Sequence, residues 1–216
     1  MSPRPAQGPL DPVPGSRWNT AMIDLALVLL GYLAGSVSTG VLVARLLGLG
    51  DPRHDGSGNP GATNVLRLGG RPAALATLLG DALKGVVPVL IAHALGLPGI
   101  TVAAVGGAAF LGHLYPVFFG FQGGKGIATG IGIFIAAAWP AGLAVVLTWL
   151  VVAGLARVSS LAALVSFALA PAYFLVISSA PALAGMAAGM ALLTAWRHRS
   201  NIRRIASGTE PRIGRR

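Results

Sequence analysis

The stretch Asp55-Gly-Ser-Gly-Asn-Pro-Gly-Ala-Thr-Asn-Val-Leu-Arg67 separates two long apolar runs, 22–47 and 72–97. Each run exceeds the ~20 residues that a helix needs to cross a bilayer. The stretch itself combines glycines, which allow close backbone approach to a ligand, with short polar side chains and a guanidinium. A flexible linker is one interpretation, but so many donors favour a phosphate or oxyanion site. The candidate ligands are Ser57, Gly58, Asn59, Thr63, Asn64 and Arg67.

The composition indicates an all-α integral membrane protein. Of 216 residues, 54% are hydrophobic and only 10% are charged, whereas soluble domains carry about 25% charged residues. The net charge of +10 does not indicate a nucleic-acid partner, because the basic residues lie beside apolar segments and are not interleaved with aromatic side chains. The chain has no cysteine, which excludes disulfides, thiol catalysis and cysteine-ligated metals.

The order of apolar segments predicts about seven transmembrane helices in one polytopic domain, 21–197. Residues 1–20 are rich in proline and glycine and are expected to form a disordered tail. A cleaved signal peptide is the alternative for the first span, but the apolar pattern continues past its cleavage site. A basic segment, 198–216, is expected to contribute to the active site. The seven spans are 22–47, 72–97, 100–119, a short one ending near 139, 141–156, 161–177 and one ending at 196.

The distribution of basic residues predicts the orientation of these spans. Thirteen of the sixteen Lys and Arg lie in the first loop, at Lys125, at Arg157 or in the C-terminal tail, and the intervening turns carry none. With seven spans, these places share one face, which the positive-inside rule makes cytoplasmic and which leaves the N-terminus outside. Spans four and five are short, so a re-entrant arrangement with fewer crossings remains open.

A second polar motif, 112–129, is expected at the same face. It contains His113 and a glycine-rich loop around Lys125, so Arg67, Lys125 and Arg157 could converge on one anion with glycine N–H groups beside it. A surface that holds anionic lipid headgroups is the competing interpretation. The second span carries Asp81 and Lys84 on one helical face, where they can form an ion pair or take part in function.

Several other chemistries lack their signatures. Phe119 and Gly126 replace the first glycine and the hydroxyl residue of a P-loop. An aspartate does not follow any of the four histidines at the H-x-x-x-x-D spacing of common glycerolipid acyltransferases. No histidine pair has zinc-ligand spacing, no acidic cluster suits Mg²⁺, and there is no G-x-S-x-G elbow. No metal or cofactor is therefore expected.

Three motifs, in this order and spacing, resemble the bacterial acyl-phosphate:glycerol-3-phosphate acyltransferases of the PlsY family. The resemblance covers residues 22–214 and extends to Asp81-Ala-Leu-Lys-Gly85 and Arg157-Val-Ser-Ser160. One departure is Gly35-Ser-Val-Ser38, where the family often has Gly-Ser-x-Pro. The motifs are Gly56–Arg67, then Gly112-His-Leu-Tyr-Pro-Val-Phe118 with Phe121-Gln-Gly-Gly-Lys-Gly-Ile-Ala-Thr129, then His198-Arg-Ser-Asn-Ile-Arg-Arg204 with Gly208-Thr-Glu210.

The resemblance implies transfer of a fatty acyl group from acyl phosphate to the 1-hydroxyl of sn-glycerol 3-phosphate. The products would be 1-acylglycerol 3-phosphate (lysophosphatidic acid) and phosphate, formed in phospholipid biosynthesis at the cytoplasmic face of the bacterial inner membrane. The implied partners are the two substrates and the lipid bilayer, without cofactor, metal or nucleic acid. The acyl chain would lie in a groove between spans that opens to lipid.

The resemblance also implies roles for site residues. Ser57, Arg67 and Lys125 are expected to hold phosphate groups. The catalytic candidates are Ser160, His198 and Asn201, and the neighbouring Ser159 is expected to bind substrate. The substrate's own phosphate and His198 both remain open as the general base. The other expected substrate-binding residues are His113, Gly123, Gly124 and Gly126.

Two non-enzymatic interpretations are weaker. A transporter of organic phosphates would have glycine-broken spans at mid-membrane and two related halves, whereas this chain has no internal repeat and its polar motifs lie at the ends of spans. A purely structural subunit would have no use for the two glycine-rich polar loops. An enzyme is therefore expected.

Overall fold

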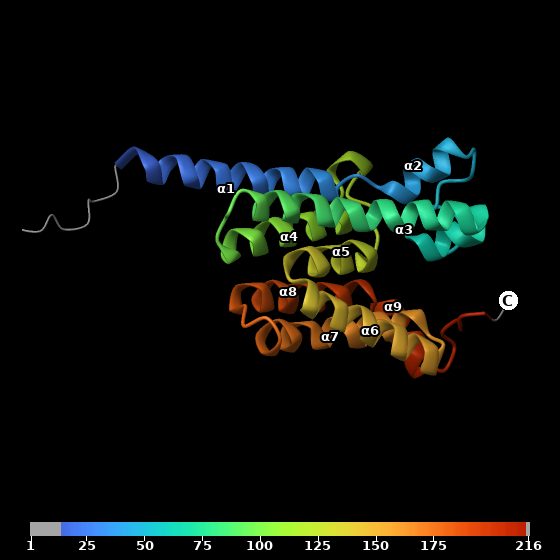
Figure 1. The fold of residues 1–216 in the computed structure, drawn as a ribbon. Helices are drawn as coiled ribbons and strands as arrows, with labels where there is room; N and C mark the ends of the chain where they lie inside the picture. Colours follow the sequence, from blue (N-terminus) through green and yellow to red (C-terminus); the bar gives the residue numbers. More distant parts are fainter. Residues whose placement is uncertain (1–13, 215–216) are drawn as a thin grey trace, which may run out of the picture.

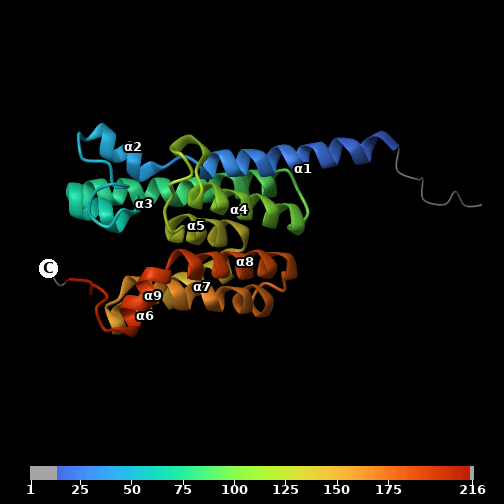
Figure 2. The ribbon, with the colours of Figure 1, turned by 180° about the vertical axis from the view of Figure 1, so that it is seen from behind.

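The computed structural model describes residues 14–214, with side chains from residue 21 onward. Most of these residues are helical, and successive long helices run in opposite directions along the molecule (Figures 1 and 2). The elements are α1 (Pro14–Gly35), α2 (Thr39–Leu46), α3 (Ala62–Ala94), α4 (Gly99–Leu114), the 3-10 turn η1 (Val117–Phe119), α5 (Ile127–Ala137), α6 (Trp139–Ala156), α7 (Ser159–Val176), α8 (Pro181–Arg197) and α9 (Arg199–Ala206).

The first predicted span differs at both ends from expectation. Residues 1–13 of the predicted tail lie outside the described residues, but α1 already begins at Pro14, a residue that suits the first turn of a helix. The predicted span over 22–47 is bent, because the chain breaks after Gly35 and α2 leaves at an angle of 41°; α1 and α2 could together form one broken span. The Lys84 ammonium donates to the carbonyl of Val37, 2.7 Å away, and so satisfies an acceptor freed by the break.

The second span also begins earlier than predicted. Helix α3 starts at Ala62, so Thr63, Asn64 and Arg67 are helical and do not belong to a loop. Gly70 interrupts this helix with φ 75°, a left-handed conformation that glycine adopts without a Cβ penalty. The polar motif is therefore a loop followed by a short helical segment, with the apolar part of α3 beyond the kink.

The packing is that of a membrane protein, with large apolar side chains on the outside. Leu75, Leu83 and Leu147 are about half exposed on α3 and α6. Aromatic rings fill the centre: the ring of Phe134 lies 5.2 Å from that of Phe167 and 5.5 Å from that of Phe174, measured between centroids. An apolar exterior is stable only in lipid, which agrees with an integral membrane protein.

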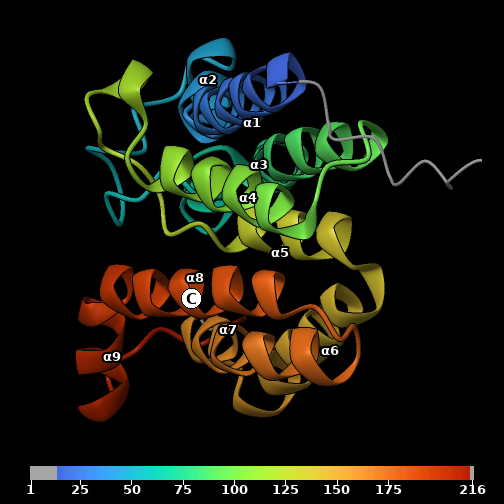
Figure 3. The ribbon, with the colours of Figure 1, turned by 90° about the vertical axis from the view of Figure 1, so that its left-hand side faces the viewer.

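Seen end-on, the helices form two groups (Figure 3). Helices α1 to α4 make one group and α6 to α8 the other, with α5 packed between α3 and α6 and a direct contact between α4 and α8. Small residues bring α1 against α4, since a Cβ on Gly35 would meet the backbone of Ala109. The polar loops and α9 gather toward one end of the bundle, at the right of Figure 1.

Among the described residues, four helical segments are long and apolar enough to cross a membrane, and the bent α1–α2 pair could be a fifth. The four are α3, α4 extended to Phe119, α6 and α7. Helices α5 and α8 have only 11 and 17 residues. The protein is thus multi-pass and all-helical, and the number seven stays a prediction.

Candidate active site

A connected polar cluster lies where four separate segments meet at the end of the bundle. Lys125 Nζ, in the loop before α5, donates to Asn201 Oδ1 on α9 at 2.5 Å. Asn201 Nδ2 donates to Glu210 Oε1 at 2.6 Å, and Ser160 Oγ, in the first turn of α7, donates to the same oxygen at 2.6 Å. Arg204 Nε completes the cluster with a 2.7 Å bond to Glu210 Oε2. The structure therefore joins three predicted site residues: Ser160 and Asn201 donate to one carboxylate, and Lys125 is connected to it through Asn201.

Glu210 is the organising residue that the sequence analysis did not assign to the site. Burial acts to raise the pKa of Glu210, but hydrogen bonds from Ser160, Asn201 and Arg204 outweigh it and lower the pKa. The carboxylate is therefore ionised at neutral pH and holds its three donors in place. The signal in the sequence was its position as the only acidic residue of the basic segment 198–216.

Lys125 and His198 are both shielded from water. Burial lowers the pKa of the Lys125 ammonium, which the Glu210 charge partly offsets. Burial and the nearby Lys125 charge lower the pKa of His198 to about 4, so its imidazole is neutral at pH 7. His198 Nδ1 lies 2.8 Å from the Thr194 carbonyl oxygen, so this nitrogen carries the proton and the other nitrogen has a lone pair available.

The glycine-rich loop is shaped to present Lys125. A Cβ on Gly124 would meet the His113 imidazole, and one on Gly123 would meet the carbonyl oxygens of His113 and Leu114. The Gly124 N–H donates to the His113 carbonyl oxygen at 3.2 Å. Arg197 donates to the carbonyl oxygens of Gly123 and Gly124 at 2.6 and 3.1 Å. The backbone groups of these glycines therefore fix the conformation of the loop. The Gly124 N–H was expected to face an anion, but it donates to the His113 carbonyl oxygen instead.

Gly126 and Ser159 flank the cluster. Gly126 has φ 83° and precedes α5, and a Cβ there would meet the Phe110 ring, so only glycine fits. Ser159 opens α7, immediately before Ser160. Both predicted residues thus adjoin a member of the cluster in the chain, Gly126 next to Lys125 and Ser159 next to Ser160.

His113 belongs to a polar network buried beneath the loop. Its Nδ1 lies 3.0 Å from Thr129 Oγ1 and 3.7 Å from Asp81 Oδ1. Asp81 pairs with Lys84 at 2.9 Å, as the helical spacing predicted, and both side chains are less than 10% exposed. His113 is therefore placed as a support for Gly124 and not as an exposed ligand. The network ties the break between α1 and α2 to the loop that carries Lys125.

The remaining candidates lie in a second cluster, the 51–67 segment. The Asn64 amide accepts from the Ser57 N–H at 2.9 Å and donates to the carbonyl oxygens of Pro52 and Asp55 at 3.0 and 2.9 Å. Asn64 is almost fully buried, so its role is to hold the loop. Gly58, with φ 68°, provides a turn that favours glycine. Exposed at the surface of this segment are Ser57, Gly58, Thr63 and Arg67, with Asn59 half-buried.

Arg53 links this segment to the loop before Lys125, a contact that the sequence analysis missed. Its guanidinium bonds to the Asp51 carboxylate, with 2.6 Å from Nη2 to Oδ2, and donates to the Phe119 carbonyl oxygen at 3.1 Å. The hydrogen bonds from Arg53 lower the pKa of Asp51 to about 2. Figure 3 shows the 47–61 loop and α9 on the same side of the bundle. The two clusters thus face one region without forming one hydrogen-bonded network.

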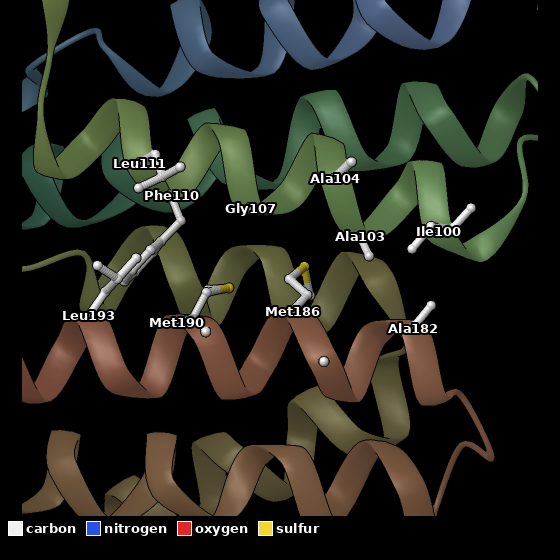
Figure 4. Close-up of a pocket in the computed structure, with 12 residues that line it drawn as sticks. Ile100, Ala103, Ala104, Gly107, Phe110, Leu111, Ala182, Met186, Met190 and Leu193 are labelled. Atoms are coloured by element: carbon white, nitrogen blue, oxygen red, sulfur yellow. The ribbon is translucent and has the colours of Figure 1, made fainter. Parts of the chain in front are cut away.

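An apolar groove runs along the helices next to the polar cluster. It has a volume of about 490 Å³ and lies between one face of α4 and one face of α8 (Figure 4). Phe110, Leu111 and Leu193 line the end nearest His113 and Arg197. Ile100 and Ala182 line the far end. A polar centre and an apolar groove thus meet at one place, an arrangement suited to a substrate with a polar head and an alkyl chain.

Within the part of the chain that the structure describes, no three His, Asp or Glu side chains gather as metal ligands.

Comparison with known proteins identifies the family. Residues 25–208 match the family described as glycerol-3-phosphate acyltransferase. The chain belongs to this family. The glycerol-3-phosphate acyltransferase of Thioalkalivibrio sulfidiphilus is 56% identical over 89% of this chain and 95% of its own length, and that of Halorhodospira halophila is 55% identical over 89% and 98%. The PlsY resemblance of the sequence motifs is therefore confirmed.

Solved structures of this family give the same fold. The crystal structure of the integral membrane glycerol 3-phosphate acyltransferase PlsY (YgiH) in its glycerol 3-phosphate form matches with a TM-score of 0.83 at 40% identity, covering 89% of this chain and 96% of that one. Its lysophosphatidic acid form matches with a TM-score of 0.81 over the same shares. The family membership and the all-helical membrane fold agree with each other.

Proposed function

We propose that this glycerol-3-phosphate acyltransferase uses acyl phosphate as its donor and acylates the 1-hydroxyl of sn-glycerol 3-phosphate. The hydroxyl oxygen attacks the acyl carbon of the mixed anhydride, and the bond from that carbon to the phosphate oxygen breaks. A new ester forms, and the hydroxyl proton leaves with inorganic phosphate. The products are lysophosphatidic acid and phosphate, and no redox step or external cofactor is needed. Phosphate is a good leaving group, so orientation and charge stabilisation can supply most of the acceleration.

The observation that carries this proposal is the Lys125–Asn201–Glu210–Ser160 cluster at the end of the apolar groove. Lys125 supplies a positive charge that is partly shielded from water, where it stabilises a phosphate or a developing oxyanion more strongly than in bulk solvent. Ser160 and Asn201 provide a hydroxyl and an amide that can orient glycerol oxygens. The groove leads an alkyl chain from the lipid to this cation.

Two groups can take the proton of the attacking hydroxyl. Neutral His198 has a nitrogen lone pair and lies close enough to Lys125 for the ammonium charge to lower the pKa of the imidazole. The phosphate of the substrate, with a second pKa of about 6, is the alternative base. We favour the phosphate, because its pKa is nearer to the pH of reaction than the value of about 4 for His198. His198 then orients a substrate hydroxyl or phosphate oxygen.

The second cluster is proposed to hold the other anionic group. Ser57 and Arg67 are exposed, in the loop between α2 and α3 and near the start of α3. This loop and the start of α3 lie at the end of the bundle where the polar loops and α9 gather (Figure 1), and an exposed guanidinium with nearby short donors suits a phosphate. Arg53 would keep this segment against the Lys125 loop. The two clusters would bring acyl phosphate and glycerol 3-phosphate together.

The proposed topology has seven crossings, with the N-terminus outside and the active site at the cytoplasmic face of the bacterial inner membrane. The alternating direction of α1 and α3 to α8 supports it, as does the gathering of basic loops at one end. A cysteine added at the C-terminus of this cysteine-free chain tests the orientation. Labelling of that cysteine by a membrane-impermeant maleimide is expected only in broken or inverted vesicles, and labelling of intact cells would contradict the proposal.

The donor can be tested with the purified protein in detergent. Radiolabelled glycerol 3-phosphate is supplied with palmitoyl phosphate, or with palmitoyl-CoA in a parallel tube, both in EDTA. Lysophosphatidic acid formed only from palmitoyl phosphate supports the proposal. Product from palmitoyl-CoA would overturn the assignment of the donor. If folded protein forms no product from either donor, the transporter interpretation is favoured and is tested by flux assays in vesicles.

A further inference from the structure

The groove between α4 and α8 has two matching apolar walls that run the length of both helices. Its α4 wall and its α8 wall each consist of residues at spacings of three and four, which is one face of a helix (Figure 4). Phe110 and Met190 are buried at its inner side, while Ala104 and Gly189 are exposed at its rim. The groove is therefore open along one side and closed behind.

Three glycines make this groove wide. A Cβ on Gly107, Gly185 or Gly189 would meet no atom within 4 Å. Glycines that serve close helix packing behave differently: a Cβ on Gly132 would meet the backbone of Ala82, and one on Gly142 that of Ile135. The groove glycines are thus not required by helix contact, and their effect is to leave space.

The size of the groove matches a long acyl chain. From residue 100 to residue 111 of α4 the helix rises about 16 Å, and an extended alkyl chain advances roughly 1.3 Å per carbon, given tetrahedral bonds of about 1.5 Å. This length accepts about 13 carbons. A methylene group is close in size to a water molecule, which occupies ~30 Å³ in the liquid. The groove volume of about 490 Å³ therefore corresponds to roughly 16 methylene groups.

We infer that the α4–α8 groove holds the acyl chain and that Gly185 and Gly189 set the chain length that the enzyme accepts. This inference rests on the proposed function. The acyl carbon lies at the Leu111–Leu193 end, next to the Lys125 loop, and the methyl end points toward Ile100 and Ala182. Gly189 lies four residues from Leu193 and Gly185 eight, which places them about 6 and 12 Å along the groove. A leucine at Gly185 would therefore block the chain after about nine or ten carbons.

Acyl phosphates of 8 to 18 carbons test this with purified wild type and Gly185→Leu, with kcat/KM measured for each donor at fixed glycerol 3-phosphate. The expected result is a ratio of 16-carbon to 10-carbon activity that falls at least tenfold in Gly185→Leu. In Gly189→Leu the block lies about 6 Å along the groove, after about five carbons, so activity should fall with every donor of 8 to 18 carbons. Gly154→Leu on α6 is the matched control, because its added Cβ would also meet no atom within 4 Å and it lies outside the groove; its profile should equal that of the wild type.

The outcomes separate the two proposals. An active wild type with an unchanged chain-length profile in Gly185→Leu overturns the groove inference and leaves the acyl transfer standing. A wild type without acyl phosphate-dependent transfer overturns the proposed function itself. If Gly185→Leu has no activity with any donor, Gly185→Ala and Gly185→Val are measured, and the loss must then appear first with the longest chains. A uniform loss across all chain lengths in that series contradicts the inference.

Discussion

Replacing Glu210 with glutamine tests whether the carboxylate organises the candidate site. The carboxylate accepts bonds of 2.6 Å from Ser160 and Asn201 and a 2.7 Å bond from Arg204. The glutamine amide keeps the shape of the carboxylate but loses its charge. Its NH₂ group is itself a donor and would face either Arg204 or the two neutral donors, to which it cannot bond. Two charge-assisted bonds then weaken by about 1 kcal/mol each. The pair with Arg204, whose side chain is 42% exposed, loses about 1 kcal/mol or less.

The expected loss of about 3 kcal/mol corresponds to a roughly 100-fold decrease in kcat/KM if it all appears in transition-state stabilisation. Acyl transfer and thermal unfolding followed by tryptophan fluorescence are measured on the same detergent samples. Arg204→Gln is the control, since it removes only the exposed partner and should cost less than tenfold. Glu210→Gln with activity within twofold of the wild type and an unchanged midpoint would refute the organising role.

Further changes address the cation, the histidine and the buried ion pair. Lys125→Ala should reduce acyl transfer at least 100-fold without loss of folded protein. Arg199→Ala, on the exposed side of α9, is the control and should keep nearly wild-type activity. A larger loss of activity in Arg199→Ala than in Lys125→Ala would remove Lys125 from the site. Since the pKa of His198 is about 4, wild type and His198→Gln should show the same inflections between pH 5 and 8, and an inflection near 6.5 confined to the wild type would contradict the neutral imidazole. Lys84→Met should lower stability by about 3–5 kcal/mol because the buried Asp81 loses its ammonium partner. The double variant Lys84→Met with Asp81→Asn should recover part of this loss, and the thermal midpoints of both variants check it.

A fifth prediction concerns acid stability. Hydrogen bonds from Arg53 hold the pKa of Asp51 at about 2, below its ordinary value of 3.8. A carboxylate with a lowered pKa stabilises the fold above its unfolded pKa, and that stabilisation is lost as the pH falls from about 4 toward 2. Asp51→Asn should therefore be less stable than wild type at pH 7 and differ less at pH 2 to 3. An equal difference at both pH values would contradict the bond to Arg53.

The membrane class and the shared position of the polar motifs were predictable from the sequence. Hydropathy identifies α3, α6 and α7 because lipid-facing helices need continuous apolar runs. Turns alternate between the two ends of such a bundle, so Lys125, Ser160 and Asn201 could be assigned to one end before the structure. The hydrogen bonds of Ser160 and Asn201 to the Glu210 carboxylate were not predicted, because no role had been assigned to Glu210.

Features that depend on contacts between distant segments could not be predicted. The break after Gly35 depends on Lys84, which lies 47 residues from the Val37 carbonyl that it satisfies. The helix start at Ala62 turned part of an expected loop into a helix, because glycine and asparagine are compatible with either state. The open space above Gly185 is visible only once α4 lies beside α8, since the sequence does not distinguish a packing glycine from one that lines a groove.

An experimental structure of the wild-type protein with bound lysophosphatidic acid tests the central claim most directly. The polar head is expected within hydrogen-bonding distance of Lys125 or Ser160, with the alkyl chain between α4 and α8 and its methyl end toward Ile100. A head group that contacts neither residue, or a chain bound between another pair of helices, would contradict it.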